Sequence, residues 1–209
     1  MWINLIFQIS QLCFCLYALP IFQVAIIPVQ QHKEGVLEAA GKIYDTLKAA
    51  GIRVKLDDSD QSPGWKFSEY EMKGVPLRIE IGPRDIAEGK CVIVRRDNRE
   101  KAFVSVDNIV SEVNAGLEAL IKALYEKALA NRENRTFNAY SLDELIKIAD
   151  ENNGYIKAMW CGDRECEEKL KEVADVSSRC MPFDGEPIAQ TCVCCGREAK
   201  KLVYWGKAY

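Results

Sequence analysis

The sequence predicts an α/β protein with a mixed five-stranded sheet flanked by helices, followed by a small α+β unit that binds zinc. Three observations lead to this fold class. Between about residues 22 and 130, short β-branched runs alternate with segments whose apolar residues recur at helical spacing. A polar, basic stretch then interrupts this periodicity. Beyond it, six of the nine cysteines lie between Cys161 and Cys195, which indicates a metal site.

Length and composition set the first limits on function. A chain of 209 residues has room for one large domain or two small ones, and its 48% hydrophobic and 28% charged residues are ordinary for a folded protein. The net charge of −3 argues against a protein that coats nucleic acid in general. It is compatible with a local basic patch, because binding depends on the field at the site.

The chain begins with an uncharged stretch, residues 1–31, which we divide near residue 20. Residues 1–19 are expected to be an orphan hydrophobic leader, from a misassigned start or the remnant of a disrupted upstream gene. A membrane anchor or a secretory signal is the alternative, but polar residues interrupt the apolar run and no positive region precedes it. Phe22–Val29, which is short and β-branched, is predicted as the first, buried parallel strand.

A helix, a strand and a loop are predicted next. Apolar residues recur at helical spacing over 36–47, and Gly51 stands where a glycine cap ends a helix. Ile52–Leu56 alternates as a strand does. The polar run Asp57–Gly64 ends in turn residues and is therefore a loop. We expect a second short helix over Trp65–Lys73.

The rest of the first domain completes a mixed sheet. Val75–Ile81 alternates as a strand, and Cys91–Val94 with Ala102–Val104 forms a predicted hairpin around a polar turn. Apolar residues over 110–124 mark a long amphipathic helix. We therefore assign residues 20–130 to the first domain.

The second unit follows a predicted linker at 131–140, where the chain is polar and lacks an apolar period. Ser141 and Glu144 form a capping box that starts a helix. The second domain is expected to span residues 141–209. It is small, so a bound metal would add substantially to its stability.

Four cysteines are predicted to bind zinc as two pairs, Cys161 with Cys166 and Cys192 with Cys195. Tetrahedral zinc is suited to thiolates from two tight turns, and a glycine follows each of Cys161 and Cys195. Because four thiolates leave no open position, the site should be structural. Cys194 could replace Cys192, and redox or disulfide use is the competing interpretation. Cys180 is spare, and Cys91 is expected in the core.

Residues 56–84 resemble the anticodon-binding domain of class II aminoacyl-tRNA synthetases. "Lys-Gly-Val-Pro" at 73–76 and "Glu-Ile-Gly-Pro-Arg" at 80–84 are characteristic of the prolyl, threonyl, histidyl and glycyl group. The four-cysteine unit, "Arg-Cys-Met-Pro-Phe" at 179–183 and the ending "Lys-Ala-Tyr" narrow the resemblance to prolyl-tRNA synthetases of the archaeal and eukaryotic-like type. The resemblance covers about residues 20–209.

The resemblance implies a set of residues that contact the tRNA anticodon. Glu71 would read one guanine by accepting hydrogen bonds from the N–H groups of that base. Arg84 would face a second guanine, and Arg78 would support the site. A basic residue in the hairpin would also contact the anticodon, either Lys101, which fits better, or Arg99. Without the resemblance, Glu71 would be an ordinary surface carboxylate and Arg78 the polar face of a strand. Trp65 and Tyr70 could stack on bases or belong to the core.

The resemblance also implies what the chain needs from elsewhere. Tyr209 would dock toward the catalytic domain, and ATP and Mg²⁺ would be used only by the full-length enzyme. No segment of the sequence matches a class II catalytic domain, so no catalytic residue is assigned and the chain alone is expected to be inactive. Expected partners are proline tRNA, a catalytic domain in cis or in trans, and a second copy in a homodimer. The expected location is the cytoplasm, and a membrane partner is not expected.

A zinc-stabilised protein-interaction module that no longer reads tRNA is the alternative function. Such a module would keep the cysteines but would have no need of Glu71, Arg84 and a basic residue near position 101. The sequence retains all three, which favours the tRNA-binding interpretation.

Overall fold

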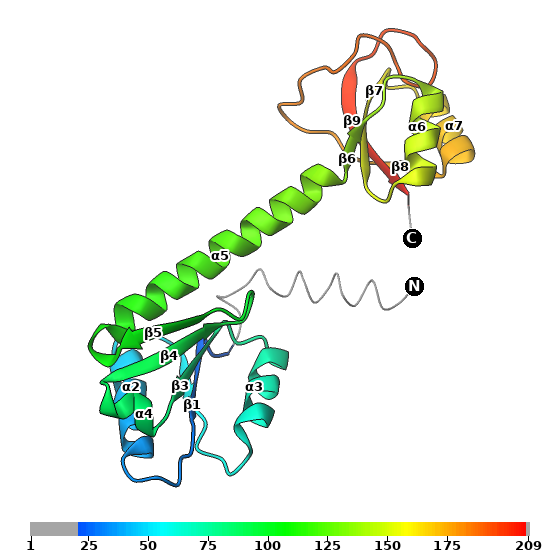
Figure 1. The fold of residues 1–209 in the computed structure, drawn as a ribbon. Coiled ribbons are helices and arrows are strands. Elements are labelled where there is room, and N and C mark those ends of the chain that lie inside the picture. Colours follow the sequence, from blue (N-terminus) through cyan, green and yellow to red (C-terminus); the bar gives the residue numbers. More distant parts are fainter. Residues whose placement is uncertain (1–20, 208–209) are drawn as a thin grey trace. The chain divides into compact units, whose positions relative to one another are not determined.

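The computed structural model describes residues 21–207, and they divide into two compact units within a long helix, after Glu126. The predicted leader, residues 1–19, and the predicted docking residue Tyr209 lie outside the described residues. Each unit holds one sheet (Figure 1). No helix among the described residues is long and apolar enough to cross a membrane.

The first unit contains the predicted five-stranded mixed sheet. Its strands are β1 (Val24–Pro28), β2 (Val54–Leu56), β3 (Leu77–Ile81), β4 (Lys90–Arg95) and β5 (Lys101–Ser105). The strand order is β2-β1-β3-β4-β5, with β1 parallel to both neighbours and β4 antiparallel to both of its own. The predicted fold class is confirmed. Cys91, expected in the core, is fully buried.

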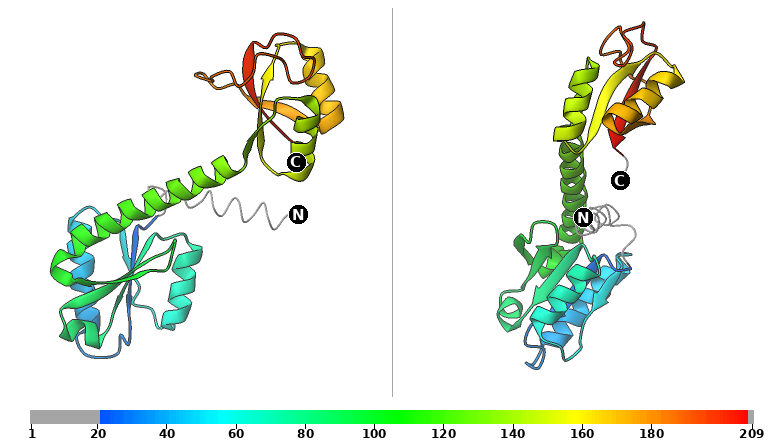
Figure 2. Two further views of the ribbon diagram at one scale, coloured as in Figure 1. Left: turned by 45° about the horizontal axis from the view of Figure 1, so that its top comes forward. Right: turned by 90° about the vertical axis from the view of Figure 1, so that its right-hand side faces the viewer.

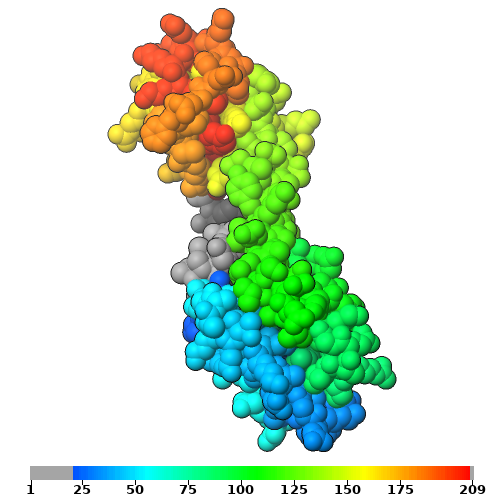
Figure 3. Space-filling model, turned by 90° about the vertical axis from the view of Figure 1, so that its left-hand side faces the viewer, coloured from blue at the N-terminus to red at the C-terminus, as the bar shows by residue number. Residues whose placement is uncertain are grey.

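Helices cover both faces of this sheet (Figure 2). The helices are α2 (Val36–Ala49), α3 (Pro63–Met72), α4 (Pro83–Ala87) and α5 (Ile109–Asn134), which follows a short 3₁₀ turn at Val106–Asn108. The apolar sides of α2 and of the start of α5 pack on one face of the sheet, around Ile26, Leu77 and Ile93. Figure 3 shows the outside of this helical layer, α2 in blue and the start of α5 in green. Helix α3 packs on the opposite face, where Tyr70 contacts the core.

The second unit is a four-stranded sheet with two helices on one face. It comprises β6 (Thr136–Asn138), α6 (Leu142–Glu151), β7 (Tyr155–Trp160), α7 (Arg164–Ala174), β8 (Val176–Cys180) and β9 (Lys201–Lys207). The strand order is β6-β7-β9-β8. Leu145 of α6 and Leu170 of α7 pack with Trp205 of β9 in one core.

The predicted linker at 131–140 is regular structure over most of its length. Helix α5 continues through Asn134, and Thr136–Asn138 is strand β6, which pairs with β7. Residues 130–135 are exposed on all sides. A helix without a buried face has no apolar period, so the sequence pattern could not reveal it.

Candidate functional site

The residues assigned to anticodon contact form a chain of alternating charges on the α3 side of the first sheet. Glu71, at the end of α3, lies 3.3 Å from Arg78 of β3, measured from Oε1 to a terminal guanidinium nitrogen. Arg78 in turn lies 2.9 Å from Glu80, two residues further along β3. Residues two apart on a strand point to the same face, which places Glu80 beside Arg78, while Glu71 approaches the same guanidinium from α3.

The two basic residues considered for the hairpin lie at the two ends of this series of alternating charges. The ammonium of Lys101, on β5, lies 3.2 Å from Oε2 of Glu80. The guanidinium of Arg99, in the β4–β5 turn, lies 3.3 Å from Oε2 of Glu71. The order is therefore Arg99, Glu71, Arg78, Glu80, Lys101, which we call the charge ladder. Each of the two basic residues pairs with a different carboxylate.

Burial separates the inner members of the charge ladder from its ends. The side chains of Arg78 and Glu80 are only 14% and 11% exposed, whereas those of Arg99 and Lys101 are 78% and 54% exposed. The guanidinium of Arg78 also stacks on the ring of Phe67, 3.9 Å from its centre. Arg78 is thus held on three sides, while Glu71, Arg99 and Lys101 remain accessible to a ligand.

Arg84 is not part of the charge ladder. It is exposed on α4, which begins after Gly82 at the far end of β3 from Arg78, and its side chain has no hydrogen bond or ion pair among residues 21–207. A small pocket beside the ladder is lined by Glu71, Arg78 and Arg96 but does not reach Arg84. The structure therefore does not bring Glu71 and Arg84 into one contact group.

The two aromatic residues considered for base stacking differ in exposure. Tyr70 is 6% exposed and belongs to the core beneath α3, so it offers no free ring face. Trp65 is 48% exposed at the start of the same helix. Of the two, only Trp65 is accessible to a base.

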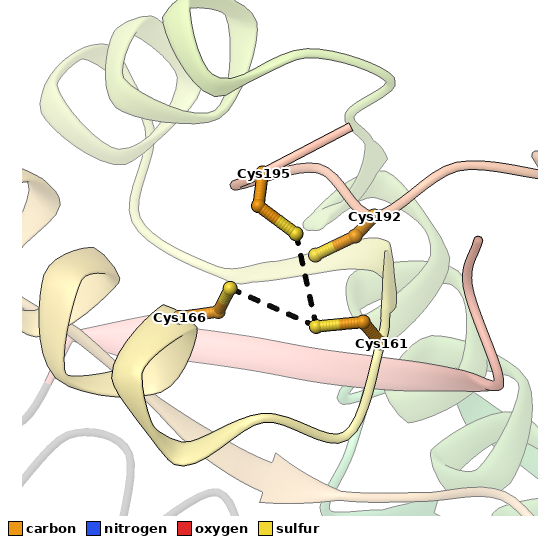
Figure 4. A group of neighbouring side chains, drawn as sticks. All are labelled: Cys161, Cys166, Cys192 and Cys195. Atoms are coloured by element: carbon orange, nitrogen blue, oxygen red, sulfur yellow. Dashed lines mark hydrogen bonds between the residues drawn. The ribbon is translucent and has the colours of Figure 1, made fainter. Parts of the chain in front are cut away.

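The four cysteines predicted as ligands come together in the second unit (Figure 4). Their sulfur atoms all lie within 4.8 Å of one another, so the group could hold a metal ion. Cys161 follows β7 and Cys166 lies in α7, while Cys192 and Cys195 lie in the turn before β9. Gly162 and Gly196 have φ of 91° and 71°, conformations that favour glycine and that fold each loop around the sulfurs.

The remaining cysteines of the second unit are not among these four. Cys194 is half-buried and packs against both the cysteine cluster and the unit's core, and Cys180 is exposed on β8. Cys192, rather than Cys194, therefore contributes to the cluster.

One arginine contacts the cysteine cluster from outside. The Nε–H of Arg197 donates a hydrogen bond to Cys195 Sγ at 3.3 Å, and another guanidinium N–H donates to the Asp163 carboxylate at 2.7 Å. The hydrogen bond from Arg197 lowers the pKa of the Cys195 thiol to about 6, whereas burial raises the pKa of Cys166. The exposed thiol of the cluster is therefore the one most readily present as thiolate.

Sequence reasoning missed Glu80, Asp163 and Arg197. Glu80 stands two residues after Arg78 in a predicted strand, so strand periodicity alone could have placed both on one face. Its partner Lys101 is 21 residues away, a pairing that no local pattern shows. Asp163 lies between the predicted ligands Cys161 and Cys166. An aspartate just before a helix is a typical N-cap, and this pattern could have identified Asp163 as the residue that caps α7.

Comparison with known proteins identifies the two units separately. Residues 23–116 match a family model described as "Anticodon binding domain", and residues 142–209 match one described as "Prolyl-tRNA synthetase, C-terminal". Similar proteins include a "Proline--tRNA ligase" of Clostridium botulinum strain 657 and one of Clostridium novyi strain NT, each 56% identical over 187 residues. A "Proline--tRNA ligase 2" of Bacillus thuringiensis strain Al Hakam is 53% identical over 187 residues. These matches cover 90% of this chain and 39% of each relative.

Proposed function

Because the chain belongs to the prolyl-tRNA synthetase family, as an anticodon-binding domain followed by that family's C-terminal domain, we propose that it binds the anticodon loop of proline tRNA. The observation that carries this proposal is the position of Glu71. Its carboxylate is fixed by Arg78 and Arg99, is one-third exposed, and lies on the anticodon-binding domain.

The chemistry of the proline anticodon fits these residues. Proline codons begin with CC, so their anticodons share two adjacent guanines. An unstacked guanine presents two N–H donors on its Watson–Crick edge, which a carboxylate accepts, and acceptors at O6 and N7, which suit Lys or Arg. Proteins read RNA sequence mainly in single-stranded loops, where such edges are free. We assign Glu71 to one guanine, Arg84 to the other, and Lys101 or Arg99 to acceptor contacts, with Arg78 as support.

The full reaction requires a larger protein. The chain spans about two fifths of the length of the relatives it matches. We propose that it works as the C-terminal part of a proline–tRNA ligase in the cytoplasm, joined to or assembled with a catalytic domain that uses ATP and Mg²⁺. In this proposal residues 20–130 read the anticodon, residues 141–209 form the metal-binding domain, and Tyr209 docks toward the catalytic domain. The homodimer is proposed for the complete enzyme.

We propose that the cysteine cluster binds one structural Zn²⁺ ion. With zinc–sulfur distances of about 2.3 Å, tetrahedral geometry sets sulfur–sulfur separations of about 3.8 Å. Cys161 lies 3.7 Å from Cys166 and 3.8 Å from Cys195. The bound ion would join the loop after β7 to the loop before β9. Four thiolates complete its coordination, so the site supplies stability rather than chemistry.

Binding of short RNA hairpins tests the function directly. The chain should bind an anticodon stem–loop with adjacent guanines more tightly than one in which adenines replace them. Glu71→Ala should weaken binding to the guanine hairpin by about 1–3 kcal/mol, because the acceptors for the guanine N–H groups are lost. Fluorescence anisotropy measures both.

Glu69→Ala is the matched control for this experiment, since Glu69 lies on the same helix and, within residues 21–207, forms its ion pair with Lys73 rather than with the charge ladder. Equal loss of binding to both hairpins in the Glu71 variant would contradict base reading. Failure of the unmodified chain to bind either hairpin would favour the protein-interaction module instead.

A further inference from the structure

We propose that Glu80 is a positioning residue of the anticodon site, which keeps the carboxylate of Glu71 open for guanine. This inference rests on the proposed function. It assigns a role to a buried carboxylate that neither the sequence motifs nor the reading of the anticodon explains. The role concerns discrimination between bases more than the strength of RNA binding.

Glu80 is a buried carboxylate shared by two cations. The residue is 9% exposed. Its Oε1 accepts hydrogen bonds from Arg78, at 3.0 Å from Nε, and its Oε2 accepts one from Lys101, at 3.2 Å. A buried carboxylate is costly unless it is paired and hydrogen-bonded. Both oxygens are paired here, so Glu80 is held in one position and holds both cations in return.

The sheet register explains how a single carboxylate reaches both cations. Arg78 pairs with Val94 across β3 and β4, and Val94 pairs with Lys101 across β4 and β5. Paired residues on neighbouring strands point to the same face. Glu80 lies two residues beyond Arg78 on that face. Lys101 therefore extends across β4 toward Glu80, and the two strands are linked on the side that faces the ligand.

The consequence for Glu71 follows from the geometry of guanidinium groups. Arg78 uses Nε and one terminal nitrogen for Glu80, and offers its other terminal nitrogen to Glu71. Arginine forms its strongest pairs with carboxylates in a bidentate arrangement. Without Glu80, Arg78 would be free to turn and bind both oxygens of Glu71. Because Oε2 of Glu71 already pairs with Arg99, a second contact from Arg78 would leave fewer free acceptor sites for the N1–H and N2–H donors of guanine.

Two variants of the full chain test this role. Glu80→Gln removes the charge with little change in shape. Glu80→Asp keeps the charge in the buried site, so the fold is preserved, but is too short to reach Arg78 and Lys101 together. The readout is the ratio of affinities for two anticodon hairpins, one with adjacent guanines and one with adenine in place of one guanine. Both variants should lower this ratio about tenfold, the discrimination of one base contact.

Glu100→Gln is the matched control, because this exposed carboxylate lies in the same hairpin and, in the described part of the chain, accepts its side-chain hydrogen bond from Asn98. It should leave the ratio unchanged. A second readout is the coupling of Glu80→Gln with Glu71→Gln: once Glu71 no longer reads guanine, the Glu80 variant should have little further effect on the ratio. A destabilised fold would instead lower the melting temperature and weaken binding to both hairpins equally.

The outcomes separate this inference from the proposed function. If the unmodified chain shows no preference for adjacent guanines, the proposed function is wrong. If the unmodified chain has the preference and a folded Glu80→Asp variant keeps it in full, the role of Glu80 is overturned while anticodon reading stands. A lowered ratio in the folded Glu80→Asp variant, absent in Glu100→Gln, supports the positioning role.

Discussion

Arg197 donates a hydrogen bond to the carboxylate of Asp163 at 2.7 Å, and this contact joins the two loops that supply the cysteine cluster. Asp163 lies between Cys161 and Cys166, and its other carboxylate oxygen caps α7 by accepting from the Glu165 N–H. Arg197 follows Cys195 and also donates to its sulfur. The pair therefore connects the loops independently of any bound ion, on the side where Cys195 is exposed.

Replacing Arg197 with Met should accelerate metal loss from the second unit. The change removes a charge-assisted hydrogen bond to the Cys195 sulfur and the link to Asp163. Removal of partners that surround metal ligands commonly lowers metal affinity about 10–100-fold. Competition with a coloured zinc chelator would measure both affinity and release rate. Arg164→Met is the control, since the ion pair of Arg164 among the described residues is with Glu168, on the surface of α7; equal release from both variants would show that Arg197 has no special role.

Chelation of the metal should unfold the second unit and leave the first intact. The cluster joins loops that are 26 residues apart in sequence between Cys166 and Cys192, and structural zinc contributes its binding free energy to folding. Calorimetry should show a transition that shifts with chelator and a second that does not. Cys166→Ser should act like chelation, whereas Cys194→Ser and Cys180→Ser should retain about one zinc per chain. A chelator-independent transition for both units would contradict the assignment.

Local patterns were enough to predict the first sheet and the cysteine group. In the strand around Ile79, apolar residues alternate with polar ones. This two-residue period can be recognised in a segment of only a few residues. Cys161 and Cys166, like Cys192 and Cys195, are close in sequence because a metal-binding turn is itself local. Each of these features depends on neighbours a few residues away.

Features that depend on distant residues could not be predicted in this way. Glu80 acquires its role from Lys101, two strands away, and Arg197 from Asp163, 34 residues away. The end of α5 was missed for a different reason. Its residues around Arg132 are exposed on every side, so they carry no apolar period.

Asp57 should make the first unit sensitive to acid. Lys66 is 1% exposed, and its ammonium lies 2.9 Å from the Asp57 carbonyl oxygen and 3.5 Å from the Asp57 carboxylate. Burial alone would raise the pKa of Asp57, but hydrogen bonds from Ser59 and the charge of Lys66 outweigh it, so the pKa is lowered. The carboxylate therefore stabilises the fold above its unfolded pKa of about 3.9, and this contribution is lost as pH falls through the lower folded value.

Asp57→Asn should consequently destabilise the first unit at pH 7 by about 3–5 kcal/mol, because it leaves a buried ammonium without its counter-charge. Urea unfolding followed across pH should show the difference from the unmodified chain shrinking below pH ~4, as Asp57 is protonated first in the unfolded chain and then, at lower pH, in the folded one. Asp58→Asn, at the exposed neighbouring position, should change little. A constant difference at all pH values would contradict the ionic role of Asp57.

Two glycines should respond to alanine with opposite signs. A Cβ at Gly154 would overlap the carbonyl oxygen of Arg135, which accepts the N–H of Tyr155 where β6 meets β7. Gly154→Ala should therefore destabilise the second unit by about 1–3 kcal/mol. A Cβ at Gly41, inside α2, would meet no atom within 4 Å, and Gly41→Ala should stabilise the first unit by about 0.5–1 kcal/mol. Thermal melting of the two variants measures both shifts; matching signs would contradict this account.

Arg78 and Arg84 should differ in what their loss does to the fold. Arg78→Met leaves Glu80 without its main partner and exposes Phe67, so it should cost about 1.5–3 kcal/mol of stability as well as RNA binding. Arg84 is exposed and unpaired within residues 21–207, so Arg84→Ala should change stability by no more than about 0.5 kcal/mol.

If Arg84 faces a guanine, its loss should weaken binding to the guanine hairpin more than to the adenine hairpin. Lys55→Ala, exposed on the opposite edge strand β2, controls for a general loss of positive charge, and an equal loss for both hairpins would reassign Arg84 to a backbone phosphate.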